Sequence, residues 1–162
     1  MRGPWKPSRT VVAAVTVPLL TGGVLTLGAA PASAATTRCS GWQQHTLPVV
    51  GKIAVKTCVQ KEGYNHKAWV HVEWFRTYGG TDFDGVKVRV RLERRNSTYK
   101  SKTCDYTKVM NQYKLGKRNC TTARVFSTQK GGWTADGYVD LNFNLDGKGW
   151  KRWELKGSPS VS

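Results

Sequence analysis

Acidic residues are scarce in this 162-residue sequence, which has 10 Asp and Glu against 26 Lys and Arg and a formal net charge of +16. It also has no long acidic tail and no internal repeat array. The length corresponds to one domain, or to one domain preceded by a targeting segment, and excludes a large multidomain enzyme. Because aromatic residues make up 10% of the chain, the composition is not that of a disordered protein.

Several short catalytic and metal-binding motifs are absent as well. Neither G-x-S-x-G nor H-E-x-x-H occurs, so nothing supports an esterase or a zinc protease. The cysteines form no C-x-x-C pair, and no histidine lies near them at zinc-finger spacing. We therefore expect no metal and no cofactor, and a binding protein is favoured over an enzyme.

Residues 1–34 predict a secretory signal peptide. Three basic residues and no acidic residue flank the start of an apolar segment at 11–30, and an Ala-Ser-Ala triplet ends at residue 34. An uncleaved membrane anchor is the alternative, because the apolar segment approaches the length that spans a bilayer. The alanine-rich style is similar to that of signal peptides in secreted bacterial proteins. The sequence thus predicts an extracellular domain at 35–162, with 23 basic and 10 acidic residues and no membrane span of its own.

The four cysteines all lie in the predicted extracellular domain, at Cys39, Cys58, Cys104 and Cys120. An even number of cysteines in an exported chain indicates disulfides, so we expect two. Three pairings are possible, and proximity in sequence favours Cys39 with Cys58 and Cys104 with Cys120. Each such bridge closes a short loop and stabilises the fold by about 3 kcal/mol in the loop-entropy model.

Alternation of apolar and polar residues predicts an all-β fold. Val86, Val88, Val90 and Leu92 alternate with charged residues, as a strand with one buried face does. Similar patterns predict further strands at 53–57, 69–75, 118–127, 138–145 and 150–155, and a short helix at 108–115. Glycine-rich segments at 78–85, 130–132 and 146–149 predict the connecting loops. We expect an antiparallel β-sandwich of about seven strands, Ig-like or jelly-roll-like, with a small closed barrel as the alternative.

The excess positive charge is concentrated in the middle of the chain. Residues 85–130 contain 13 basic and two acidic residues, whereas 131–162 contain four of each. A concentrated positive charge attracts anionic partners, so the first hypothesis is a non-enzymatic module for a cell-wall polymer, an anionic lipid or a nucleic acid. A basic surface that only maintains solubility is the alternative. The candidate binding residues are Lys87, Arg89, Arg91, Arg94, Arg95, Lys114, Lys117 and Arg118.

Two further hypotheses come from aromatic and titratable residues. The alternation at 69–75 places Trp74 in the core and turns Trp69 and Phe75 outward, and exposed rings can stack on sugars. This pattern predicts an aromatic-led carbohydrate-binding module. The other hypothesis is a small secreted nuclease, in which His71 and Glu73 act on a phosphodiester. Arg89 and Arg91, expected on a neighbouring strand, would stabilise the developing charge. The catalytic candidates are His71, Glu73 and Arg89.

Overall fold

The computed structural model describes residues 34–47, 51–77, 82–144 and 147–162. All but the last residue of the predicted signal peptide lies outside the described residues. The first half of the predicted loop at 78–85, residues 78–81, lies outside them too, as do Leu145 and Asp146. No helix among the described residues is long and apolar enough to cross a membrane.

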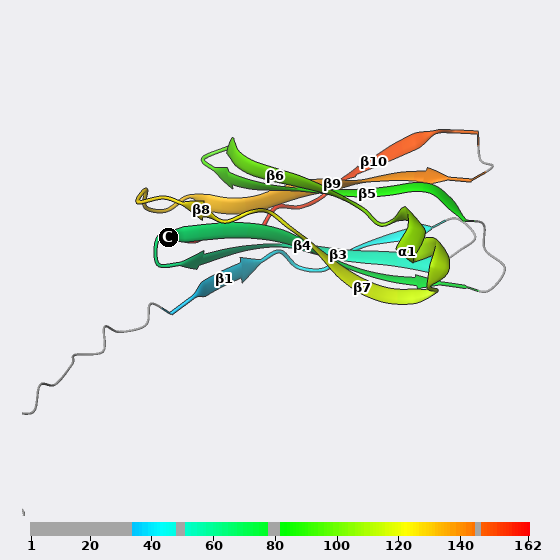
Figure 1. The fold of residues 1–162 in the computed structure, drawn as a ribbon, viewed down its shortest axis with the longest axis horizontal. Coiled ribbons are helices and arrows are strands. Elements are labelled where there is room, and N and C mark those ends of the chain that lie inside the picture. Colours follow the sequence, from blue (N-terminus) through cyan, green and yellow to red (C-terminus); the bar gives the residue numbers. More distant parts are fainter. Residues whose placement is uncertain (1–33, 48–50, 78–81, 145–146) are drawn as a thin grey trace, which may run out of the picture. The chain divides into compact units, whose positions relative to one another are not determined.

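Ten strands within the described part of the chain form two antiparallel sheets, which lie face to face as two layers (Figure 1). Sheet A has the order β1-β3-β4-β7, with β2 also paired to β3 and β8 to β4. Sheet B has the order β10-β9-β5-β6. The elements are β1 (Thr36–Cys39), β2 (Gln43–Leu47), β3 (Gly51–Glu62), β4 (Asn65–Arg76), β5 (Phe83–Arg94), β6 (Ser97–Asp105), α1 (Thr107–Gln112), β7 (Leu115–Thr121), β8 (Val125–Phe126), β9 (Trp133–Phe143) and β10 (Trp150–Glu154).

The all-β prediction is confirmed, and the closed barrel is wrong because the two sheets remain separate. Apolar side chains on alternate residues of β3, β4, β5 and β9 meet between the sheets and form the core. On β5, Val86, Val88, Val90 and Leu92 are fully buried, as their alternation predicts. Each such side chain contributes about 1.5–3 kcal/mol when it is removed from water, so this one strand provides a large part of the stabilising free energy.

The structure has more strands than the sequence pattern predicts. The expected strand at 118–127 is two strands, β7 and β8, and β1, β2 and β6 were not expected. Strand β6 has no buried side chain along its nine residues, and pairs only with β5. A strand whose two faces are both wet shows no apolar alternation, because neither face is selected for burial. Its lysines suit an edge position, where charge discourages pairing with other chains.

A disulfide closes one edge of the sandwich. Cys104 on β6 of sheet B is bonded to Cys120 on β7 of sheet A, so the bridge joins the two layers. The second disulfide, Cys39–Cys58, lies within sheet A, where it links β1 to the facing residue of β3. Both predicted pairings are confirmed.

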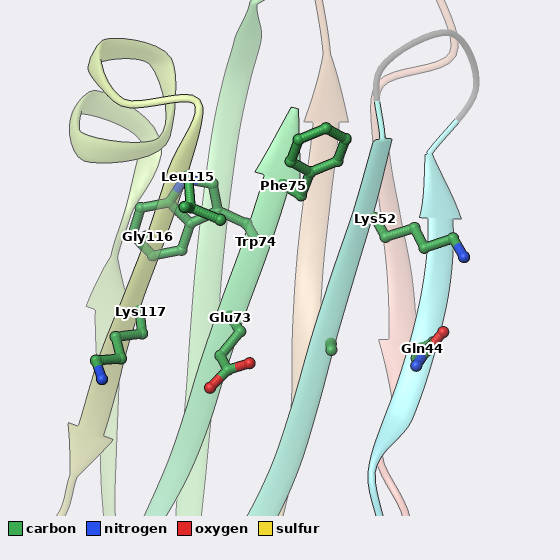
Figure 2. Close-up of a pocket in the computed structure, with 9 residues that line it drawn as sticks. Gln44, Lys52, Glu73, Trp74, Phe75, Leu115, Gly116 and Lys117 are labelled. Atoms are coloured by element: carbon green, nitrogen blue, oxygen red, sulfur yellow. The ribbon is translucent and has the colours of Figure 1, made fainter. Parts of the chain in front are cut away.

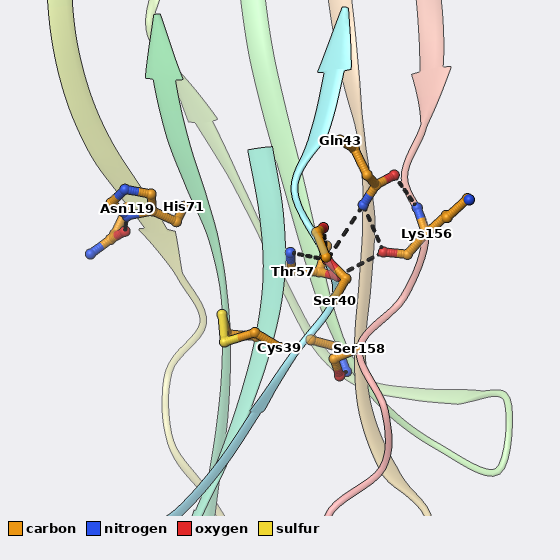
Figure 3. Close-up of a disulfide and its surroundings, with 11 residues drawn as sticks. Cys39, Ser40, Gln43, Thr57, His71, Asn119, Lys156 and Ser158 are labelled. Carbon is orange, nitrogen blue, oxygen red and sulfur yellow. Dashed lines mark hydrogen bonds between the residues drawn. A yellow bond between two sulfur atoms is a disulfide. The ribbon is translucent and has the colours of Figure 1, made fainter. Parts of the chain in front are cut away.

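Hydrogen bonds to the segment after β10 close the opposite edge (Figure 3). Gln43 on β2 donates to the carbonyl of Lys156 at 3.1 Å and accepts from the Lys156 amide at 2.6 Å. The Thr57 hydroxyl also donates to the Lys156 carbonyl, at 2.8 Å. Because β2 and β3 belong to sheet A and this segment continues from sheet B, the contacts hold the two layers together and leave both outer faces open.

A buried histidine makes the stability of the fold depend on pH. His66 on β4 is 1% exposed, and its ring stacks on that of Trp133 with the centroids 4.2 Å apart. Burial lowers the pKa of His66 below 6.5, and the charge of Lys61 lowers it further. The folded protein therefore resists a proton that the unfolded chain accepts.

We expect the free energy of unfolding to be unaffected by this group above pH 6.5 and to decrease as the pH falls below that value. Urea titrations at a series of pH values between 7.5 and 5 measure the effect. His66→Phe keeps an aromatic ring against Trp133 and removes the titration, so its stability should fall less over the same interval. An equal loss in the two proteins would contradict this role of His66.

Candidate functional site

The outer face of sheet B carries the centre of the predicted basic surface, but acidic side chains balance it. Lys87, Arg89 and Arg91 all project outward from β5. The same face also presents Arg152 of β10 and five acidic residues, which are Glu93, Asp105, Asp136, Asp140 and Glu154. Glu93 belongs to β5 itself, whereas the other four acids come from β6, β9 and β10, and the sheet pairing brings them to the side of the basic row.

Close ion pairs occupy several of these charges. The Arg91 guanidinium lies 2.8 Å from Glu93 and 2.8 Å from Asp136. Hydrogen bonds from Thr107 hold the pKa of Asp105 below its usual value, and Lys87 contributes to the same shift. Asp105 is therefore ionised at neutral pH, and this face offers little net attraction to an anion.

The other predicted binding residues are dispersed around the molecule. Arg94 ends β5 and donates to the carbonyls of Gly131 and Lys130, and Arg95 lies in the turn that follows β5. Lys114 directly precedes β7. Lys117 is on the outer face of sheet A, whereas Arg118 is opposite Val72, on the inward side of the β7 edge. The structure therefore does not bring the eight predicted residues into one patch.

The constellation expected for a nuclease is also divided between the sheets. His71 Nε2 lies 3.0 Å from Glu73 Oε1, as two residues on one side of β4 can. The neighbours of β4 are β3, β7 and β8, however, and β5 belongs to sheet B. The expectation that Arg89 and Arg91 lie beside His71 is wrong, because the outer faces of the two sheets point in opposite directions.

The outer face of sheet A has a different composition from that of sheet B. Strands β3, β4 and β7 turn Lys52, Lys56, Lys67 and Lys117 outward. The acids on the same side are Glu62, which pairs with Arg124, and Glu73, which contacts His71. Aromatic rings lie among these lysines, so this face combines an excess of positive charge with apolar surface.

A trough of about 530 Å³ crosses this face (Figure 2). It spans four strands, because its lining residues come from β2, β3, β4 and β7. The strand registers place them in two adjacent rows. One row contains Lys52, Phe75 and Leu115, and the other contains Gln44, Ala54, Glu73 and Lys117.

Two small residues shape the middle of the trough. Ala54 offers only a methyl group there, and Gly116 contributes backbone because its side-chain position faces the inner side of β7. The indole of Trp74 lies directly behind Gly116, where a Cβ would come within 2.2 Å of the ring. The Trp74 Nε1–H donates to the carbonyl of Tyr113 at 2.8 Å, which fixes the ring in this position. Glycine at 116 therefore allows β7 to lie flat against Trp74.

The upper end of the trough in Figure 2 is apolar and exposed. Phe75 is 54% exposed and Leu115 is 74% exposed, although both belong to well-paired strands. Side chains of this size are unusual on the wet face of a sheet. Their position beside a depression makes this face a candidate binding surface, on stronger grounds than either residue would give alone.

A second row of functional groups lies next to the trough. The Trp42 ring meets the edge of the His71 ring at 5.5 Å, and Lys56 Nζ is 4.6 Å from the centroid of Trp42. His71 Nδ1 lies 2.6 Å from Asn119 Oδ1, and these two side chains are neighbours on β4 and β7 (Figure 3). The row extends the candidate surface beyond the trough with an aromatic ring, a cation and an amide.

Most residues of this surface were missed because they lie in the part of the sequence with little net charge. Residues 35–84 contain six basic and four acidic residues, which conceals the local excess at Lys52 and Lys56. The alternation of Ile53 and Val55 with Lys52, Ala54 and Lys56 does indicate that the two lysines share the outward side of this strand. The outward position of Phe75 agrees with the alternation along β4.

Among the described residues, no group of three or more His, Cys, Asp or Glu side chains is arranged to hold a metal ion. The trough and the row beside it present ring faces, ammonium groups, one carboxylate and amides. Comparison with known proteins finds no matching family model, no similar curated protein and no similar solved structure.

Proposed function

We propose that this protein is an exported, non-enzymatic module that binds an anionic polymer through the outer face of sheet A. The observation that carries the proposal is the difference between the two faces. Four lysines on sheet A are interspersed with aromatic rings and face few acids, whereas the basic row on sheet B is matched by five carboxylates. An exported location agrees with two disulfides, which persist in oxidising compartments.

Electrostatics and shape act together in this proposal. The trough has lysines at two of its corners, Lys52 on β3 and Lys117 on β7 (Figure 2). An anionic polymer that lies in it displaces counterions and approaches both ammonium groups, so its affinity should decrease steeply with salt. Lys56 lies two residues beyond Ala54 on β3, and Lys67 lies further along β4, so the two extend the positive surface along the sheet.

A paired-variant experiment tests which face binds. Lys52→Ala/Lys117→Ala removes two charges from sheet A, and Lys87→Ala/Arg89→Ala removes two from sheet B. We expect the first to weaken binding to heparin about tenfold in low salt, equivalent to about 1.4 kcal/mol, and the second to change it little. Affinity chromatography and titration calorimetry over a range of salt concentrations provide the measurement.

If Lys87→Ala/Arg89→Ala weakens heparin binding more than Lys52→Ala/Lys117→Ala does, the binding site is on sheet B. Absence of binding by the unmodified protein to heparin, DNA and a phosphate-linked cell-wall polymer, even in low salt, would overturn the proposal. All of these positions are on the solvent side of the sheets, so the variants should fold normally, which urea unfolding verifies.

A further inference from the structure

We infer that the polymer is an acidic polysaccharide in which charged and uncharged sugars alternate, and that it lies across the strands of sheet A. This inference rests on the proposed function and specifies the ligand of the same face. It is carried by the direction of the trough, by its exposed apolar end and by the order of charges along it.

The direction follows from the residues that line the trough. Gln44, Ala54, Glu73 and Lys117 occupy one row across β2, β3, β4 and β7. Adjacent strands are about 4.8 Å apart, so four strands give a path of about 14 Å between the outer backbones. A ligand that fills the trough is therefore extended and several units long.

The apolar end identifies the kind of unit. A pyranose ring presents C–H groups on its faces and hydroxyl groups around its rim. The exposed ring of Phe75, with Leu115 beside it, matches such a face, while Gln44 and Glu73 can hydrogen-bond hydroxyls at the rim. A polyphosphate has no apolar face to offer, and phosphate ions alone would leave Phe75 and Leu115 in water.

The order of charges identifies the pattern of units. Lys117 and Glu73 are direct neighbours across β7 and β4, and Lys52 lies one strand further, in the adjacent row. The two lysines are thus two strand spacings, about 10 Å, apart across the sheet and about 7 Å apart along it, which makes about 12 Å between their backbones, and Glu73 lies on the strand between them. A polymer with an acid on every sugar would place one of its acids against Glu73. A polymer with acids on alternate sugars can place them at the lysines and a hydroxyl at Glu73.

The outer face of sheet B supplies an internal control. Trp150 is an exposed ring beside Lys87, with the ammonium 4.9 Å from the ring centroid, and it also borders a depression. The Asp140 carboxylate there is paired with Arg152 through bonds of 2.8 and 3.1 Å. An exposed aromatic residue and a cation are therefore present on both faces, but the trough across four strands belongs to sheet A.

The experiment compares four polymers with the purified protein. They are hyaluronan, in which an acidic sugar alternates with a neutral one, polygalacturonate, dextran and polyphosphate. We expect hyaluronan to bind at least tenfold more tightly than each of the others at equal concentration of repeating units. Phe75→Ala should weaken hyaluronan binding about tenfold and polyphosphate binding less than twofold, whereas Trp150→Ala should change neither.

Glu73→Gln tests the order of charges separately. Removing this carboxylate should raise the affinity for polygalacturonate at least threefold and leave the affinity for hyaluronan within twofold of that of the unmodified protein. The preference for hyaluronan over polygalacturonate should therefore decrease. Leu115→Ala provides a second probe of the apolar end if Phe75→Ala alters the urea midpoint. Because Phe75 and Leu115 are both exposed, neither change should affect folding.

Two results would overturn the inference. In the first, the protein binds hyaluronan, polygalacturonate and polyphosphate equally tightly per charge, and Phe75→Ala changes none of these affinities. This result would show that the face recognises charge alone, and the proposed function would remain valid. Tight binding of double-stranded DNA together with weak binding of hyaluronan would assign the face to nucleic acid. Absence of binding to all anionic polymers is a different result, which defeats the proposed function itself.

Discussion

Trp133→Ala should cost about 3–5 kcal/mol of unfolding free energy, the range measured when a large aromatic side chain is removed from a core. Trp133 begins β9 and is fully buried. Its ring stacks on His66 and meets the edge of Tyr99, and its Nε1–H donates to the Gln129 carbonyl. Removing the indole therefore leaves a cavity in the core and takes away the donor to the Gln129 carbonyl.

Such a loss is a large share of the 5–15 kcal/mol that stabilises a typical domain. Urea unfolding monitored by circular dichroism measures it, and Trp133→Phe should show a smaller loss if the alanine variant is too unstable to purify. Trp42→Ala is a matched control, because Trp42 is 46% exposed and should lose about 1 kcal/mol or less. Similar losses at positions 133 and 42 would contradict the assignment of Trp133 to the core.

Removal of the Cys104–Cys120 bridge is expected to have the next largest effect, about 3 kcal/mol or more. The two cysteines have a sequence separation of 16, for which the loop-entropy model gives about 3 kcal/mol. It also joins β6 of sheet B to β7 of sheet A, with Cys120 fully buried in the core. Cys104→Ala/Cys120→Ala therefore removes a constraint on the unfolded chain and leaves a small cavity between the layers.

The other disulfide allows these two contributions to be separated. Cys39–Cys58 has a sequence separation of 19, so loop entropy alone predicts nearly the same effect for both bridges. It lies within sheet A, however, and anchors only the short strand β1. We expect Cys39→Ala/Cys58→Ala to lose less stability in urea titrations under non-reducing conditions. Equal losses would show that the link between the sheets adds nothing to the entropic term.

Strands with one wet and one buried face were predictable from sequence, because burial imposes a period of two on their residues. Strands β4, β5 and β9 follow this rule closely, and their inward valines form the core. Strand β6 could not be predicted in the same way, since it is held by backbone hydrogen bonds to β5 and by one disulfide. The separation of β7 from β8 depends on how each pairs with β4, which no local pattern specifies.

The candidate surface was less predictable than the fold. Lys87, Arg89 and Arg91 are conspicuous in sequence because few acids lie near them along the chain. In the folded protein, Asp136 and Asp140 lie on the adjacent strand β9 and Glu154 lies on β10 beyond it, all on the same face. Electrostatic potential depends on distance in space, so a charge sum over a segment misses acids that strand pairing brings close.

The sequence by itself determined the all-β class and the direction in which alternate side chains of the long strands point, and it favoured the two disulfide pairings that the structure shows. These properties depend on residues close together in the chain, or on the number and spacing of the cysteines. Only the tertiary structure decided which charges share a face, and it placed Lys52 and Phe75 beside Lys117 and Leu115. The physical reason is that a surface is assembled from strands far apart in sequence, and their order in the sheets is set by packing of the core.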